Sequence, residues 1–491
     1  MRHILEIVSS LVRGDRVPTF PLTDDDREDP DDEFHQLFAQ ANARLLRVQR
    51  ELKGAGVSDL RLSVTVLFLF LRVADHFRAL VKKQKTQKLL VRFAIKRRSL
   101  EALQELHGEI DQLFALLKLT HEPEMNEWRR HWTGDRHAMH TAFAARVENP
   151  RLAIADLPQA QIVEALAILK YEMEYHEDGN STEQLRIMRR TYMKVVECSK
   201  AHVPKIPEFF IPSMNVELET PNHSIVDVPA NCTVTSCTVT SCTWDRDTRL
   251  AVQYLRTDAH FPEQLFLRAT EMWHGLEHPN LVKMLGTSHV RSPAVVVWED
   301  AGAYGNFLSY FASGCDKHKC HQLRLCRMFL QAARGLNHMH SQGLTHGNLK
   351  CAHILVSTDE TAKICDLGLI YGLEQGAFSR WKSPEANNGS GADPSKPDDV
   401  YAFGLCIIEA RTGAIPYGMD ADDLIENRLR QGEAYPRPEG MRDDEWDVVK
   451  KLCALKPEDR PTMEQTIEML DELAVREEQE ERADVQGKLK E

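Results

Sequence analysis

Apolar residues recur at three- and four-residue intervals through most of the first 200 positions. The first such stripe consists of Phe34, Leu37, Phe38, Ala41, Leu45, Leu46 and Val48. A second stripe runs to about Leu80 and a third from Leu100 to Leu117, and residues 122–147, 159–175 and 182–199 repeat the spacing. This period is that of an α-helix. We therefore predict an all-α domain over residues 32–200, an antiparallel helical bundle with bracing helices.

The pattern changes after residue 200. Prolines at positions 204, 207, 212 and 221 predict an extended linker over residues 201–222. The segment Thr233–Cys237 is then repeated at once as Thr238–Cys242, an alternating β-branched pattern typical of a β-hairpin. Residues 223–475 mix strand-like and helical patterns, so the fold class is α+β. Residues 1–31, with an acidic run, are expected to be an extension, and residues 476–491 a charged tail.

Composition narrows the class of protein. The chain has 491 residues and a formal net charge of -13, which argues against binding to nucleic acid. Its 11 cysteines follow no disulfide framework, which indicates a reducing compartment. The most apolar stretch, Leu62–Leu71, is too short to span a bilayer, so we expect a cytoplasmic protein. Cys315, Cys320 and His321 lack a second pair at ligand spacing, and no metal site is predicted.

Five ordered motifs occupy the second half of the chain. They are His278–Val282, Thr345–Leu369, Arg380–Glu385, Asp399–Gly404 and Pro457–Pro461. In this order and spacing they resemble protein kinases, most closely the tyrosine-kinase-like group. The resemblance implies a two-lobed protein-kinase fold over residues 223–475, with a small β-rich lobe and a helical lobe.

The same resemblance implies that the parts needed for phosphoryl transfer are missing. No glycine occurs between positions 179 and 275, so the phosphate-binding loop is lost. Gln253 stands at the position of the phosphate-binding lysine, and Ala269 at that of its glutamate partner on the αC helix. Asn348 replaces the aspartate base, and His353 replaces the asparagine that binds the second magnesium. An amide cannot accept a proton as a carboxylate does.

Other positions match the family. The retained motif residues are His346, Lys350, Asp366 and Gly368, and the structural set is Glu385, Asp399 and Arg460. The lobe-spanning packed column would consist of Trp273, Met284, His346 and Leu367, with Trp298 near the gatekeeper position. The resemblance thus implies a kept fold and lost chemistry, a pseudokinase. No cofactor is expected; weak ATP binding without turnover and an unorthodox active serine/threonine kinase are the alternatives.

A basic interval lies within the helical half. No acid occurs between Asp75 and Glu101, where nine lysines and arginines do. One interpretation is a solvated helix face or a connecting loop. The other is contact with an anionic membrane through residues 78–98, with Lys82, Lys83, Lys85, Lys88 and Arg92 as the candidate lipid contacts. No motif that reads nucleic acid accompanies these charges.

The order of the two halves resembles the architecture of mixed-lineage kinase domain-like proteins. The helical segment Leu106–Phe114 supports this similarity. The resemblance implies a bundle that delivers the output and a kinase-like half that acts as a switch or scaffold. Its partners would be signalling proteins. The protein would be located in the cytoplasm or at the surface of a membrane. The sequence leaves homo-oligomerisation open.

Overall fold

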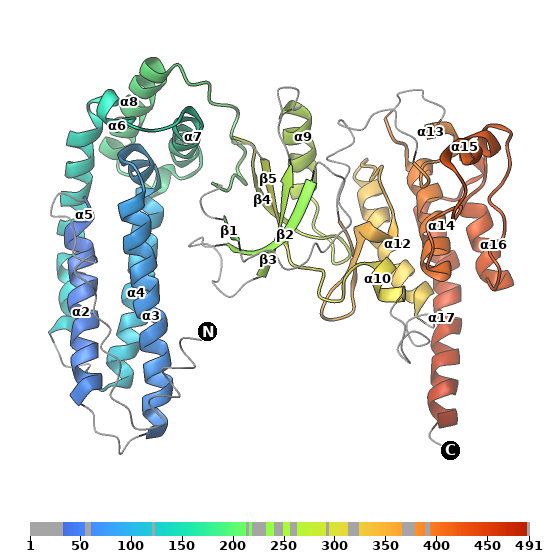
Figure 1. The fold of residues 1–491 in the computed structure, drawn as a ribbon, viewed down its shortest axis with the longest axis horizontal. Helices are drawn as coiled ribbons and strands as arrows, with labels where there is room; N and C mark the ends of the chain where they lie inside the picture. The colour runs from blue at the N-terminus through green and yellow to red at the C-terminus, as the bar shows by residue number, and fades with distance from the viewer. Residues whose placement is uncertain are drawn as a thin grey trace. The chain divides into compact units, whose positions relative to one another are not determined.

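A computed structural model describes most of the chain. The described residues are 33–54, 60–119, 123–212, 216–218, 232–239, 249–255, 263–290, 294–312, 324–365, 379–387 and 393–488. They divide into two compact units, one that ends at Glu208 and one that begins at Phe209 (Figure 1).

The first unit consists of helices. They are α2 (His35–Gly54), α3 (Leu60–Thr86), α4 (Leu89–Leu116), α5 (Glu124–Val147), α6 (Pro150–Ala153), α7 (Gln159–Tyr175) and α8 (Thr182–Ser199) (Figure 1). Helix α4 is central, since it packs against α2, α3, α5 and α7. Its Leu103, Leu106 and Ile110 are fully buried. The helical pattern of residues 32–200 agrees with this arrangement, except that α4 begins at Leu89 and not at Leu100.

The second unit begins with a five-stranded antiparallel sheet. Its strands are β1 (Val216–Leu218), β2 (Cys232–Val239), β3 (Arg249–Leu255), β4 (Met284–Ser288) and β5 (Ala294–Glu299), in the order β1-β2-β3-β5-β4. The described part of the tandem repeat lies in one strand, since β2 runs through the junction of the two copies. This strand pairs antiparallel with the next one, β3, as the β-hairpin pattern predicted, and Cys237–Thr238 offers no residue that favours a turn within the strand.

Part of the expected linker is built into the edge of this sheet. Phe210 forms a parallel bridge with Thr287 of β4. The Ile211 amide donates to the Thr287 carbonyl at 2.9 Å, and the Thr287 amide donates to the Phe209 carbonyl at 3.1 Å. The Phe209 ring stacks on His274 with centroids 4.4 Å apart. A side chain at Gly286 would lie 2.5 Å from the Ile211 Cδ1 atom, so only glycine admits this close approach.

Helices form the remainder of the unit. Helix α9 (Glu263–His274) precedes β4, and the hairpin β6 (Ile354–Val356) and β7 (Ala362–Ile364) follows α10 (Phe307–Ala312) and α12 (Leu325–Ser341). The others are α13 (Pro384–Asn387), α14 (Lys396–Thr412), α15 (Asp422–Arg430), α16 (Asp443–Leu452) and α17 (Met463–Lys488). Helix α14 is buried from Asp399 to Ala410. One hydrophobic core joins α9, the sheet, α10, α12, α14, α16 and α17.

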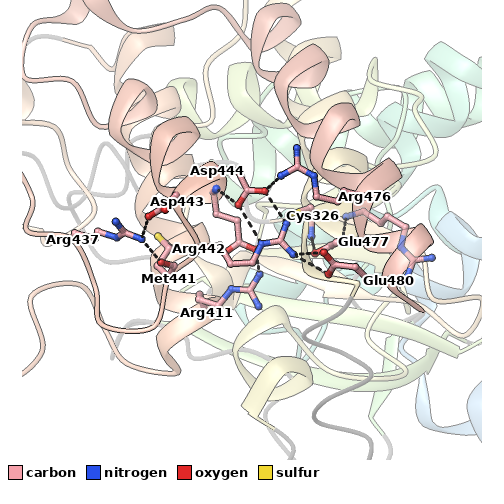
Figure 2. Close-up of polar contacts among 12 residues, drawn as sticks. Cys326, Arg411, Arg437, Met441, Arg442, Asp443, Asp444, Arg476, Glu477 and Glu480 are labelled. Carbon is pink, nitrogen blue, oxygen red and sulfur yellow. Dashed lines mark hydrogen bonds and ion pairs between the residues drawn. The ribbon is translucent and has the colours of Figure 1, made fainter. Parts of the chain in front are cut away.

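Residues expected to be a charged tail belong to α17. This helix continues to Lys488, and Glu477 within it is only 1% exposed. The Glu477 carboxylate accepts hydrogen bonds from the amides of Cys326 and Arg327 at 2.9 and 3.1 Å, in the first turn of α12 (Figure 2). Arg442 binds Glu480 of the same helix at 2.9 Å. Glu477 therefore binds the free amides at the N-terminus of α12, and Glu480 binds an arginine. Both environments favour a negatively charged carboxylate.

The structure also bears on membrane insertion. Within the described ranges, no helix combines the length and the apolar character needed to cross a bilayer.

Candidate functional site

Gln253, which the sequence analysis predicts to stand at the position of the phosphate-binding lysine, lies in the middle of β3. The side chain is 3% exposed. Its Oε1 atom accepts a hydrogen bond from Nε1 of Trp298 at 3.2 Å. A buried amide with a hydrogen-bond partner is stable without any charged ligand. The position thus supplies no positive charge to a phosphate.

Two tryptophans connect the sheet to α9. Trp298 of β5 is opposite Met284 of β4 and is buried. Its ring meets that of Trp273 at 90°, with centroids 5.4 Å apart. Trp273 is fully buried on α9, and its Nε1 donates to the Val282 carbonyl at 2.9 Å. Ala269 lies one helical turn earlier, half-buried against the same core, and its methyl group provides no partner for a lysine.

His346 is held in a loop that Asp399 shapes. The amides of His346 and Gly347 each donate to the Asp399 carboxylate at 2.7 Å. Gly347 has a φ of +74°, a conformation that favours glycine. The His346 ring accepts from the Asn348 amide at Nδ1 (3.2 Å) and contacts the Cys365 carbonyl through Nε2 (2.9 Å). Nε2 must then carry the proton, so the imidazole is used for holding the loop.

His353 takes part in the same loop. It is fully buried, and its Nδ1 atom donates to the Asn348 carbonyl at 2.7 Å. Magnesium prefers oxygen ligands, and an imidazole is a poor substitute for an amide oxygen. Asn348 itself has no carboxylate to take a proton from an acceptor hydroxyl. His353 therefore supplies no oxygen ligand and Asn348 no carboxylate base, while both residues hold the loop through hydrogen bonds.

Lys350 follows this loop and lies beside an aromatic ring. Its Nζ atom is 5.9 Å from the centroid of the Trp381 ring. The Trp381 Nε1 atom donates to Glu409 at 3.0 Å, and the Cys351 amide donates to the same carboxylate at 3.1 Å. Burial raises the pKa of Glu409, while the two hydrogen bonds lower it. The lysine charge thus lies near Glu409, a buried acid of α14.

Glu385 and Arg460 form a two-bond ion pair. The bonds from the guanidinium to the carboxylate measure 2.5 and 2.9 Å, and the arginine side chain is fully buried. The same guanidinium donates to the carbonyls of Ala454, Leu455 and Pro397. This planar fork joins three segments that are distant in sequence.

Several residues singled out from the sequence lie outside the described residues. These are Asp366, Leu367 and Gly368, together with Cys315, Cys320 and His321. Of the predicted column, Trp273, Met284 and His346 are described, and all three are buried.

Among the residues that the structure describes, two buried clusters of cysteine and glutamate have ligand atoms close enough to hold a metal. One is Cys351, Cys406 and Glu409, and the other is Cys326, Glu445 and Glu477. Their carboxylates already have partners: Glu409 accepts two hydrogen bonds, Glu477 caps α12, and Glu445 pairs with Arg411. Each of the three carboxylates thus has at least one oxygen engaged by a donor of the protein.

The basic interval of the first unit separates into two parts. Lys82, Lys85 and Lys88 are exposed and Lys83 is half-exposed, at the end of α3 and the turn before α4. Arg92 instead binds the buried carboxylate of Glu33 at 3.1 Å, so this candidate lipid contact is engaged within the bundle. Such partners lie far away in sequence, which is why no local pattern could reveal them.

Two more basic residues of the interval point inward. Arg97 makes bonds of 2.5 and 2.8 Å to Glu172 of α7. Lys96 is 3% exposed, and burial lowers its pKa to about 8. Three of the nine basic residues, Arg92, Lys96 and Arg97, are therefore engaged within the bundle.

Comparison with known proteins gives the family of the second unit. Residues 229–470 match the model for protein tyrosine and serine/threonine kinases. Human inactive tyrosine-protein kinase 7 is 31% identical over 245 residues, which are 47% of this chain and 23% of that protein. Mouse tyrosine-protein kinase Fer is 27% identical over 227 residues, 44% of this chain and 27% of that protein. The chain thus covers about a quarter of the length of these relatives.

A sponge protein is covered more fully. Tyrosine-protein kinase SRK3 of Spongilla lacustris is 27% identical over 244 residues, which are 47% of this chain and 71% of that protein. Residues 229–470 are therefore a protein kinase domain with tyrosine-kinase relatives, one of which carries the word inactive in its name.

Proposed function

We propose, from the premise that residues 229–470 are a protein kinase domain, that this domain serves signalling by binding partners and not by phosphoryl transfer. In this proposal the domain keeps a two-lobed fold, and the helical unit delivers the output. Partners would be signalling proteins in the cytoplasm. The family relationship to an inactive kinase favours the same conclusion.

The observation that carries the proposal is the environment of Gln253. An active site would need a cation here, yet the position holds a neutral amide that is buried and bonded to Trp298. The changes at Ala269, Asn348 and His353 act in the same direction. A lone lysine or glutamate would be costly in this setting, so the joint loss of both is physically consistent.

Nucleotide binding and phosphotransfer by the full chain test the proposal. We expect no shift of the melting temperature with Mg-ATP and no transfer of labelled phosphate to the chain or to a general protein substrate. The matched variants are Asp366→Ala, at the retained magnesium position, and Asp471→Ala, an exposed acid on α17. Transfer that Asp366→Ala abolishes and Asp471→Ala leaves intact would show an unorthodox active kinase and overturn the proposal.

A second function has its own observation in the first unit. Lys82 and Lys85 near the end of α3 and Lys88 in the turn before α4 are close together in sequence and exposed. Each basic residue near an anionic bilayer contributes about 1 kcal/mol to binding. We propose that the bundle contacts anionic membranes through this turn, which would make it the effector part.

Vesicle flotation of the full chain tests this contact. We expect binding to vesicles with phosphatidylserine, and its loss when Lys82, Lys85 and Lys88 become glutamate. The charge-matched control changes Arg186, Arg189 and Arg190 of α8, which are also exposed, to glutamate. No binding by the unchanged chain, or equal loss in both triple variants, contradicts a specific contact.

A further inference from the structure

We infer that Gln253, Trp298 and Trp273 form a neutral relay that holds α9 in one position on the sheet without nucleotide. This relay takes over the mechanical part of the lysine–glutamate ion pair, whose two positions are Gln253 and Ala269. The inference deepens the proposed function and rests on it, because it concerns how a non-catalytic domain fixes its regulatory helix.

Each link of the relay is a direct contact. On the sheet, the Trp298 indole donates to Gln253 at 3.2 Å, which ties β5 to β3 through side chains as well as through the ladder. From β5 the contact passes to α9, where the Trp298 and Trp273 rings meet edge to face at 5.4 Å. Aromatic rings in this geometry attract each other more strongly than the burial of their apolar surface alone explains.

The relay ends on the main chain before β4. Trp273 donates from Nε1 to the Val282 carbonyl at 2.9 Å. Both indole N–H groups therefore have acceptors, and all three side chains of the relay are almost fully buried. A buried and fully bonded polar set specifies one arrangement, because any displacement would leave a donor without a partner.

The position of the relay on α9 explains how it can replace an ion pair. Trp273 follows Ala269 by four residues, so the two lie on the same helix face, one turn apart. Because Ala269 carries only a methyl group, the side-chain contact from α9 to β5 is made by Trp273. At the same end of α9, His274 is stacked on Phe209 at 4.4 Å, which adds a second fixed point.

The groups of the relay are uncharged, and this determines how α9 responds to a nucleotide. An ion pair at this place is coupled to phosphate binding through the lysine charge. Amide and indole groups carry no charge and need no phosphate, so α9 keeps its position whether or not a nucleotide is present. The exposed side of α9, which includes Arg268 and Glu271, would then be a constant surface for a partner.

Hydrogen exchange on the full chain tests the relay. We compare amides of α9 (residues 263–274) with those of α14 (residues 396–412) as an internal reference, with and without Mg-ATP. In Gln253→Leu and Trp298→Leu we expect exchange in α9 to rise by about tenfold while that in α14 changes by less than about twofold. Gln253→Leu nearly conserves volume, so it removes the acceptor without a large cavity. Trp446→Phe, at a half-buried tryptophan of α16, is the matched control.

Three results would overturn the relay. The first is unchanged exchange of α9 in both variants. The second is equal acceleration of α14, which would mean ordinary core packing. The third is slower exchange of α9 in the unchanged protein when Mg-ATP is added, which would mean coupling to nucleotide. The proposed function fails separately, through measured phosphotransfer, and that failure would leave the exchange results of the variants as they are.

Discussion

At the scale of single residues, the first unit carries charged side chains in its core as well as on its surface. Arg44 of α2 is buried against His107 of α4 and pairs with Asp111, and its guanidinium lies over the Phe114 and Trp128 rings. Burial, followed by the Arg44 charge, lowers the pKa of His107 to about 3, so this imidazole stays neutral at ordinary pH. The bundle thus contains polar groups whose partners are positioned by neighbouring helices.

Lys96 is the buried charge whose effect on stability is easiest to measure. Its Nζ atom lies 4.1 Å from the centroid of the Phe93 ring, and burial lowers its pKa to about 8 from the usual 10.5. The folded protein therefore binds this proton less tightly than the unfolded chain does. Between these two pKa values the unfolded state holds more protons, so this group makes stability rise with pH there.

We expect Lys96→Met to raise the free energy of unfolding by roughly 1–3 kcal/mol at pH 7, because the cost of a buried charge is removed. The gain should shrink as the pH rises from 8 to 10.5. Urea denaturation across this range measures it, with the exposed Lys88→Met as control. A gain that is independent of pH, or equal in both variants, would contradict the assignment.

At the scale of elements, two segments outside the family match complete the second unit. The match ends at residue 470, but α17 continues to Lys488 and places Glu477 on the first turn of α12. Before the match, Phe209, Phe210 and Ile211 lie along β4. The domain is therefore longer at both ends than its family model.

Gly286 tests the segment before the match. A Cβ atom at this position would lie 2.5 Å from Ile211 Cδ1 and 2.6 Å from the Phe209 carbonyl oxygen. We expect Gly286→Ala to lower the free energy of unfolding by about 1–3 kcal/mol, as overpacking does, and to speed proteolysis between residues 201 and 212. Denaturation and limited proteolysis measure these effects.

Gly275→Ala is the matched control. Its added Cβ would meet nothing closer than 3.6 Å. If the two alanine variants are equally stable and equally resistant, the contact between β4 and Phe209–Ile211 does not hold in solution.

At the scale of the whole molecule, the described residues form two compact units, each with buried apolar side chains of its own. Units with separate cores generally unfold as separate cooperative transitions. We expect two calorimetric transitions, with Lys96→Met moving one and Gly286→Ala moving the other. A single transition that both variants shift would show that the units unfold together.

Much of the architecture could be predicted from the sequence, because its signals are local. Helical spacing gave the positions of α2, α5, α7 and α8, since a buried helix face repeats every three or four residues. Motif spacing indicated a kinase domain, which the family match confirms for residues 229–470. The charged end of α17 was misjudged because Glu477, a buried acid, looks like its exposed neighbours in sequence.

The sequence alone determined which chemical groups stand at the predicted kinase positions: an amide at 253, a methyl at 269, an amide at 348 and an imidazole at 353. Only the tertiary structure decided what these and other groups contact. It placed Trp298 between Gln253 and Trp273, and it gave Arg92 and Arg97 the partners Glu33 and Glu172. The sequence states the type of each residue directly. Contacts between distant positions form only when separate elements pack together, so no local periodicity predicts them.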